Sequence, residues 1–305
     1  LRRCSVSSTD LQLKREEAWS NDRDRSHTTE RAGFLAFSED FVVDFSRRAI
    51  YGLEGPRWLG DPGEVVELRG RGLDGQAVNG ARPEPARVCF GATFAGGSYI
   101  DIPNDPDLSV ADELTVMAWI NVASLPGAGG LKTIVSKDEN YEYHVDSNGE
   151  LYWWWTTETG IARSFTSGYQ LPLNTWVHTA ITYSRRDGVQ RIVIDGVERA
   201  RQTYSGESLQ INTDPFQIGA DQGFSGREFE GQIDEVRLYG RALSDAAILR
   251  EAHRTRPCAQ VLDHFRVVVP ATASVCAPVD VRIQAEDAGD NVLSGYQSTI
   301  RLTTS

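Results

Sequence analysis

Four consecutive aromatic residues, Tyr152, Trp153, Trp154 and Trp155, are the part of this sequence best suited to binding a ligand. In an extended strand, neighbouring side chains point to opposite faces, so Trp153 and Trp155 share one face while Tyr152 and Trp154 share the other. One pair can fill a core, and the other pair then lies on the surface. Flat aromatic faces stack well on sugar rings and apolar partners, so the outer pair is a candidate ligand platform. The alternative is that both pairs are covered, one by a facing sheet and one by loops or flanking domains.

A second group of candidates consists of carboxylates and amides in predicted loops. Hard oxygen ligands of this kind suit calcium, and they could line one edge of a calcium-dependent site. Turns favour Asp and Asn for conformational reasons alone, so simple turn chemistry is the competing interpretation. The residues are Asn104, Asp105, Asp107, Asp138, Glu139, Asn140, Asp214 and Asp221.

No motif in the sequence predicts catalysis. Glycoside hydrolases need two carboxylates at a set separation, which an E-x-D-x-x-E strand provides in laminarinase-type enzymes. The stretch DENYEYHVD contains Asp138, Glu139 and Glu142 but lacks that spacing. No G-x-S-x-G motif supplies a nucleophilic serine, and His144 and His178 lie in strand-like runs. We therefore expect no enzyme activity.

Charge and length limit the partners and the number of domains. The chain has 43 acidic and 31 basic residues and a formal net charge of -12, so it repels phosphate backbones and anionic lipid heads. It also lacks an apolar run of about 18 residues, and we expect neither nucleic-acid binding nor membrane insertion. The excess carboxylate fits calcium coordination, and solubility alone also explains it.

The length of 305 residues suggests about two domains, and the start at Leu1 suggests a fragment of a longer protein.

The elements that must position these residues are short strands separated by turns. The run LTVMAWINV is apolar on both faces, which predicts an inner strand that is covered on each side. The stretches IDGVE and DSNGE each predict a tight hairpin. We expect one short helix at residues 244–253, with Ser244 as its N-cap. The predicted strands are residues 92–94, 99–102, 114–122, 132–136, 141–145, 151–156, 162–166, 176–184, 190–194, 216–218 and 231–239.

This pattern of many short strands and almost no helix predicts an all-β sandwich or jelly roll. We place the sandwich at residues 49–257. Residues 1–48 resemble the tail of a preceding β-domain, since they contain only short strand-like runs. Residues 258–305 resemble the first strands of an immunoglobulin-like β-domain, because FRVVVP, VDVRIQAEDA and YQSTIRLTTS alternate with period two.

The four cysteines lack the spacing of a zinc site. Cys89 and Cys258 bracket the predicted sandwich. If the first and last strands lie side by side, these two residues could form a disulfide, which would fit an exported protein. Cys258 with Cys276 is the competing local pairing. Cys4 and Cys276 could also pair with residues outside the chain.

Three stretches together resemble laminin-G-like domains, which are concanavalin A-like jelly rolls. ATFAGGSYIDIPNDPDLSVADELTVMAWINV looks like the opening strands of such a domain, and LPLNTWVHTAITYSRRDGVQRIVIDGVE looks like the middle hairpin. GQIDEVRLYGRALSDAAI looks like the closing strand and short helix. With LYWWWTTETGIARSFTS, GQAVNGA and LDHFRVVV, the chain is also similar to the MSHA pilus biogenesis protein Q group, exported proteins associated with type IV pili.

The resemblance implies a structural calcium ion. In related sandwiches, the aspartate at the position of Asp234 often helps to hold calcium near a glycine turn, which here ends at Gly97. Glu54 could supply another oxygen. By alternation Asp234 shares a face with Val236 and Leu238, where an unpaired carboxylate would cost several kcal/mol. The alternative is that Asp234 accepts hydrogen bonds from backbone amides without a metal.

These observations predict a non-catalytic adhesion or assembly module that binds a glycan or a surface protein. The resemblance implies an extracellular or cell-surface location in a bacterium, with pilus components as further candidate partners and calcium as the candidate cofactor. A structural spacer without a ligand is one alternative, and a glycoside hydrolase is another. Fold alone cannot choose among these functions.

Overall fold

The computed structural model describes residues 6–7, 10–11, 46–55, 57–204, 206–255, 258, 264–268 and 282–286. The chain divides into two compact units, Leu1–Val43 and Asp44–Ser305. In the first unit, β1 (Val6–Ser7) pairs with β2 (Asp10–Leu11). Cys4, Cys276 and most of the predicted flanking strands lie outside the described residues. The domain limits at residues 48 and 257 therefore stay predictions.

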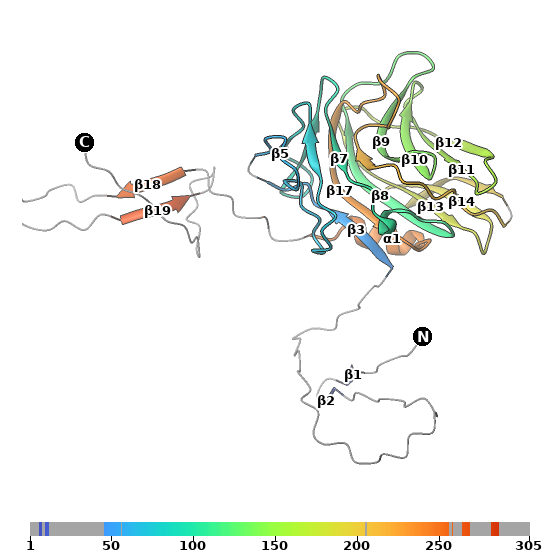
Figure 1. The fold of residues 1–305 in the computed structure, drawn as a ribbon, viewed down its shortest axis with the longest axis horizontal. Coiled ribbons are helices and arrows are strands. Elements are labelled where there is room, and N and C mark those ends of the chain that lie inside the picture. The colour runs from blue at the N-terminus through green and yellow to red at the C-terminus, as the bar shows by residue number, and fades with distance from the viewer. Residues whose placement is uncertain are drawn as a thin grey trace, which may run out of the picture. The chain divides into compact units, whose positions relative to one another are not determined.

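The main body is the predicted two-sheet antiparallel sandwich (Figure 1). The first sheet has seven strands in the order β12-β11-β10-β9-β16-β7-β4. These strands are β4 (Gln76–Val78), β7 (Tyr99–Ile102), β9 (Leu131–Lys137), β10 (Tyr141–Asp146), β11 (Glu150–Thr156), β12 (Ala162–Gln170) and β16 (Phe216–Ile218).

The second sheet has eight strands in the order β15-β14-β13-β8-β17-β6-β5, with β3 pairing to β17. These strands are β3 (Arg47–Tyr51), β5 (Arg82–Pro85), β6 (Phe90–Phe94), β8 (Glu113–Val122), β13 (Trp176–Ser184), β14 (Val189–Ile194), β15 (Val197–Thr203) and β17 (Gly231–Tyr239). A short 3-10 helix η1 (Pro106–Leu108) and the helix α1 (Asp245–Ala252) complete the sandwich. Beyond it, β18 (His264–Val268) pairs with β19 (Arg282–Glu286).

Strand β8 shows why its sequence is apolar on both faces. It lies between β13 and β17, and Val116 points into the core that the two sheets share. Met117 points the other way and packs with Ile248 of α1. Trp119 lies on this same outer side and donates from Nε1 to the carbonyl of Ala252, at 3.1 Å. The helix therefore covers the outer face of the eight-stranded sheet, as the two-sided pattern predicts.

Both predicted hairpins are present, but only one has the two-residue turn. Asp195 and Gly196 both have positive φ, 50° and 75°, which is the type I′ geometry that Asp-Gly favours. The hairpin between β10 and β11 has a three-residue loop, 147–149, in which Gly149 takes a φ of 77°. Asp146 closes this loop, since its Oδ1 accepts from the amide of Asn148 at 2.9 Å.

A disulfide joins Cys89 to Cys258, with the two Cα atoms 5.3 Å apart. It ties the turn before β6 to the segment after α1, although the two residues are 169 positions apart in sequence. Cys258 is thus bonded to Cys89 and not to Cys276. Disulfides persist mainly in oxidising compartments, so this bond is consistent with export.

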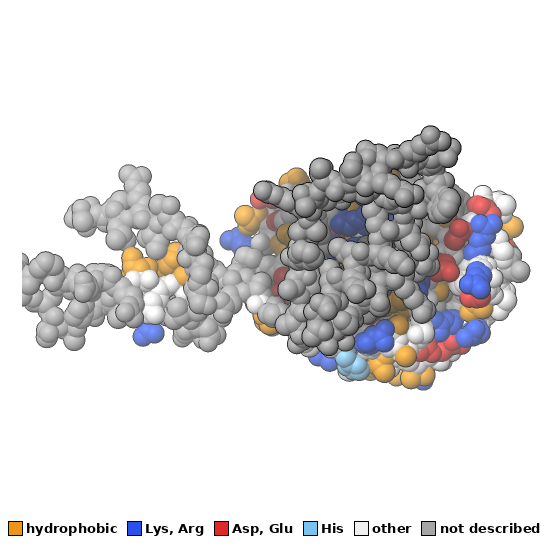
Figure 2. Space-filling model, turned by 90° about the horizontal axis from the view of Figure 1, so that it is seen from below, with side chains coloured by type: hydrophobic (Ala, Val, Ile, Leu, Met, Phe, Trp, Pro, Cys, Tyr) orange, Lys and Arg blue, Asp and Glu red, His pale blue; other side chains and the backbone are white. Residues whose placement is uncertain are grey.

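Charged side chains of both signs are interspersed over the described surface that Figure 2 shows. Arg and Lys alternate with Asp and Glu along the visible edge of the sandwich. The helices in the described part of the chain are too short to cross a membrane.

Candidate functional site

Strand β11 divides the four aromatic residues as alternation predicts. Trp153 and Trp155 are fully buried in the core, with ring centroids 6.4 Å apart. Trp155 also lies 5.5 Å from the ring of Tyr183, which comes from the opposite sheet. Tyr152 and Trp154 point away from this core and are half-buried. Only Tyr152 and Trp154 are therefore placed to meet a ligand.

The outward pair lies beside two buried polar residues of β10. Trp154 is the cross-strand partner of Glu142, and Tyr152 is the partner of His144. The rings of Tyr152 and His144 have centroids 6.0 Å apart. We call the side of the seven-stranded sheet that carries these four residues the aromatic face. On the other side of β11, Trp154 pairs with Ser164 of β12, so both of its cross-strand partners are polar.

Glu142 and His144 reach this face because the stretch YEYHV alternates. Its apolar members point into the core, and Glu142 and His144 point the other way. Glu142 is only 3% exposed and His144 is fully buried. His144 Nε2 lies 3.2 Å from Glu142 Oε2, and Nδ1 lies 3.0 Å from the hydroxyl of Thr133. The imidazole is thus held at both nitrogens.

Asp221 joins this pair from the loop between β16 and β17. The hydroxyl of Ser136 donates to Asp221 Oδ1 at 2.8 Å. Arg227 Nη1 lies 2.5 Å from Asp221 Oδ2 and 3.8 Å from Glu142 Oε2. The guanidinium therefore partly neutralises two carboxylates that would otherwise repel each other.

Burial and neighbouring charge shift several pKa values in this cluster. Burial, the charges of Glu142 and Asp221, and a hydrogen bond to Glu142 raise the pKa of Asp138 to about 7. Burial and the charge of Asp221 raise the pKa of Glu142 to about 7. Burial lowers the pKa of His144 to about 4, so the imidazole is neutral at pH 7. Shifted groups gathered on one face are typical of functional sites and also occur in structural networks.

Glu142, His144 and Asp221 form a buried group that could hold a metal ion. One ligand atom from each residue lies within 4.8 Å of the other two. Two carboxylates with one imidazole suit a transition metal ion better than calcium, which prefers six to eight oxygens. Arg227 would have to withdraw from Asp221 to admit a divalent cation, since it already supplies the positive charge there.

The three calcium ligands predicted from the resemblance, Asp234, Glu54 and Gly97, do not lie around one point. Ile233 pairs with Ala92, which sets Asp234 near the start of β6, where its Oδ2 accepts from the amide of Val88 at 2.7 Å. Glu54 Oε1 accepts from Phe90 at 3.4 Å, at the same end of β6. Gly97 follows the other end of that strand, roughly 10 Å further along.

The prediction that Asp234 shares a face with Val236 and Leu238 is wrong, because β17 contains a bulge. Glu235 takes a positive φ of 53°, and the register with β8 shifts after Asp234. Asp234 pairs with Trp119 on the outer side of the eight-stranded sheet, whereas Val236 and Leu238 point into the core. The extra residue in the bulge reverses the alternation that the sequence suggests.

At the loop edge that the sequence proposes for calcium, a lysine supplies a cation. Lys137 is fully buried, and its ammonium donates to Asn104 Oδ1 at 2.8 Å and to the carbonyl of Asp214 at 2.6 Å. It also reaches Asn212 Oδ1 at 3.3 Å. Two of the predicted residues, Asn104 and Asp214, therefore converge, but they surround an ammonium group, and Asp214 contributes its backbone carbonyl. Burial lowers the pKa of Lys137 to about 8.

Residues 94–249 match the family described as the concanavalin A-like lectin/glucanases superfamily, laminin-G type. The chain belongs to this family. Among solved structures, it is similar to the binding domain of Paraclostridial Mosquitocidal Protein 1, with a TM-score of 0.56 and 16% identity over 67% of this chain and 51% of that one. The chain thus spans about half the length of that binding domain. No curated protein matches the chain.

Two further similar structures contain bound sugars. Domain 4 of AbnA, an extracellular GH43 arabinanase from Geobacillus stearothermophilus, is in complex with arabinotriose, with a TM-score of 0.53, 19% identity, and coverage of 68% of this chain and 98% of that one. The ligand-binding domain of botulinum neurotoxin serotype D is in complex with N-acetylneuraminic acid, with a TM-score of 0.51, 14% identity, and coverage of 67% and 50%. At these identities the likeness shows the fold alone. None of these findings supports the resemblance to the MSHA pilus biogenesis protein Q group.

Proposed function

We propose that this chain is an exported, non-catalytic module that binds a glycan through its aromatic face. The observation that carries the proposal is the position of Trp154, which is half-buried and directly opposite Glu142. A flat indole that stacks on a sugar ring, next to a carboxylate that accepts from its hydroxyls, is a common arrangement for sugar recognition. The sugar-bound relatives support a binding role for this fold.

The residues on and beside the aromatic face have distinct roles in this proposal. Trp154 stacks on one sugar ring, and Tyr152 extends the apolar surface toward His144. Asp138 is half-buried at the end of β9 and hydrogen-bonds to Glu142, so it is the carboxyl group that a sugar hydroxyl reaches most easily. Arg227 holds Asp221 in place behind them. Trp153 and Trp155 support the strand from the core and do not touch the ligand.

For the metal, the donor set favours a transition metal ion over the calcium predicted from the sequence. Glu142, His144 and Asp221 would hold it, and it would replace the charge that Arg227 now supplies. The ion would fix the three side chains behind Trp154, and in this proposal it has a structural role.

The proposal is tested by glycan-array binding of three proteins: the wild type, Trp154→Ala and Trp176→Ala. Trp176 is a matched control because it is a half-buried tryptophan at the start of β13, in the other sheet. We expect Trp154→Ala to lose binding and Trp176→Ala to keep it. If wild-type protein binds no glycan on the array, or Trp154→Ala binds as well as wild type, the chain is better explained as a structural spacer.

A glycoside hydrolase is tested separately by incubating the protein with a panel of β-glucans. Release of reducing ends that Glu142→Gln abolishes would make the protein an enzyme and would contradict the non-catalytic proposal. We expect no release, because no second carboxylate lies on the same strand as Glu142 in the spacing such enzymes use.

A further inference from the structure

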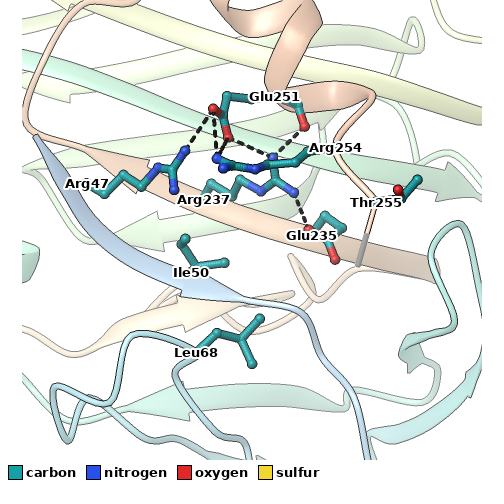
Figure 3. Close-up of a pocket in the computed structure, with 8 residues that line it drawn as sticks. All are labelled: Arg47, Ile50, Leu68, Glu235, Arg237, Glu251, Arg254 and Thr255. Atoms are coloured by element: carbon teal, nitrogen blue, oxygen red, sulfur yellow. Dashed lines mark hydrogen bonds and ion pairs between the residues drawn. The ribbon is translucent and has the colours of Figure 1, made fainter. Parts of the chain in front are cut away.

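A cavity of about 160 Å³ lies against the eight-stranded sheet, between β3, β17 and the C-terminal end of α1 (Figure 3). Three arginines from three segments line it: Arg47 from β3, Arg237 from β17 and Arg254 from the residues after α1. The carboxylates among its described lining residues are Glu235 and Glu251. Three guanidiniums against two carboxylates leave one formal positive charge, which is the reverse of the chain's net charge of -12.

The two carboxylates offer too few acceptors for all the N–H donors of the three arginines. Glu251 accepts from Arg47 at 2.9 Å, from Arg237 at 3.1 Å and from Arg254 at 3.2 Å. Figure 3 shows these three side chains converging on this one carboxylate. Glu235 contacts Arg237 at 2.5 Å. Since a guanidinium offers five donors, one shared carboxylate leaves donors over.

Two of the remaining donors are buried. The Nε atoms of Arg47 and Arg237 are inaccessible to solvent and meet no hydrogen-bond acceptor among the described residues. The Arg237 side chain is only 7% exposed. A buried charged donor without an acceptor costs free energy, and native proteins rarely tolerate two together. A negative charge in the cavity would offset this cost electrostatically, because it would lie beside both guanidiniums.

We propose that this pocket binds one singly charged oxyanion group, a carboxylate or a sulfate ester. A single negative charge balances the one excess positive charge, and planar guanidiniums match carboxylate and sulfate oxygens well. Ile50 and Leu68 line the side of the cavity opposite Glu251 and provide an apolar wall for the body of the ligand (Figure 3). The volume equals that of about five water molecules, which suits a charged group with part of a ring. Arg254 is 53% exposed, so it can exchange its contact with Glu251 for one with the ligand.

This inference concerns a different sheet from the aromatic face and does not depend on the glycan proposal. The test is isothermal titration calorimetry on the full chain with sodium methyl sulfate and with sodium galacturonate, in chloride buffer of matched ionic strength. Galactose is the uncharged control for galacturonate. We expect saturable binding of at least one anion, and we expect Trp154→Ala, which lacks the aromatic platform, to bind no galactose. Trp154→Ala should leave anion binding unchanged.

Two variants decide whether the pocket is responsible. Arg254→Gln should weaken anion binding roughly tenfold or more, the usual effect of losing a charge-assisted hydrogen bond. Arg250→Gln makes the same charge change on the exposed surface of α1, outside the cavity, and should bind like wild type. Binding of methyl sulfate alone would assign a sulfate-ester group, and binding of galacturonate would assign an acidic sugar. Absence of saturable binding by both anions, or equal loss in the two variants, would overturn the proposal.

Discussion

Trp154 of β11 and Glu142 of β10 are direct cross-strand partners on the aromatic face. The pair places a half-buried indole beside a carboxylate that is 3% exposed. Glu142 is linked in turn to His144, and Arg227 links Glu142 to Asp221. A change at Trp154 therefore acts on the surface, whereas a change at Glu142 disturbs a buried network.

The two faces of β11 should respond differently to truncation. We expect Trp153→Ala to lower the free energy of unfolding by about 3–5 kcal/mol, because it leaves a large cavity in the core. Trp154→Ala should lower it by only about 1–2 kcal/mol, since the indole is half-buried. Urea unfolding followed by circular dichroism measures both values. Equal losses would mean that Trp154 is a core residue and not a surface platform.

The raised pKa of Asp138 predicts how stability depends on pH. A carboxyl group whose pKa is raised on folding stabilises the protein fully below its unfolded pKa and loses that contribution as pH rises through the folded pKa. For Asp138 the window runs from the model-peptide value of 3.8 to about 7. Asp138→Asn imitates the protonated form, so it should become more stable relative to wild type as pH rises across this window. We expect a change of about 1–2 kcal/mol after allowance for solvent screening of a half-buried group.

The pH dependence of wild-type stability does not isolate Asp138, because two buried histidines change stability in the opposite direction. Burial lowers the pKa of His144 to about 4 and that of His178 to about 3. The folded protein therefore loses stability as pH falls, because the unfolded chain binds protons at these histidines first. These effects partly cancel the carboxyl effects in the wild-type curve. Thermal melts of the two proteins at matched pH values isolate Asp138. Parallel curves between pH 4 and pH 7 would show that its pKa is close to the ordinary value.

A metal at Glu142, His144 and Asp221 should stabilise the folded protein. We expect zinc to raise the melting temperature by several degrees and calcium to raise it less, since a ligand that binds only the native state shifts the equilibrium toward it. His144→Gln should remove the zinc effect. His253→Gln is the matched control, because His253 is exposed at the end of α1. A melting temperature that zinc leaves unchanged would show that these three residues do not bind zinc in the folded protein.

The disulfide between Cys89 and Cys258 should contribute substantially to stability. Because it closes a loop of 169 residues, its loss should lower the free energy of unfolding by about 2–5 kcal/mol. Replacing both cysteines by serine tests this without leaving an unpaired thiol at position 89 or 258. Denaturant unfolding of the double variant in oxidising buffer should match that of the reduced wild type. An unchanged midpoint would argue that the residues after α1 add little to the fold.

Local sequence patterns determined most of the elements of this protein. Period-two alternation separates Trp153 from Trp154, and the apolar run of β8 indicates cover on both faces before any partner is known. Ser244 caps α1 as predicted, accepting from the amide of Ala247. These features follow from backbone geometry over a few residues, which the sequence specifies directly.

Tertiary structure alone decided which distant residues share a site. Because of the bulge at Glu235, Asp234 lies on the face opposite to the one that alternation predicts. No local sequence pattern predicts this bulge. Glu142 and His144 have period-two spacing that marks a shared face, but their meeting with Asp221 depends on strand order across the sheet. The ammonium of Lys137 occupies the position expected for calcium, because two loops that are distant in sequence, one with Asn104 and one with Asn212 and Asp214, meet around it. Such groupings depend on long-range pairing, and the sequence encodes it only through the whole fold.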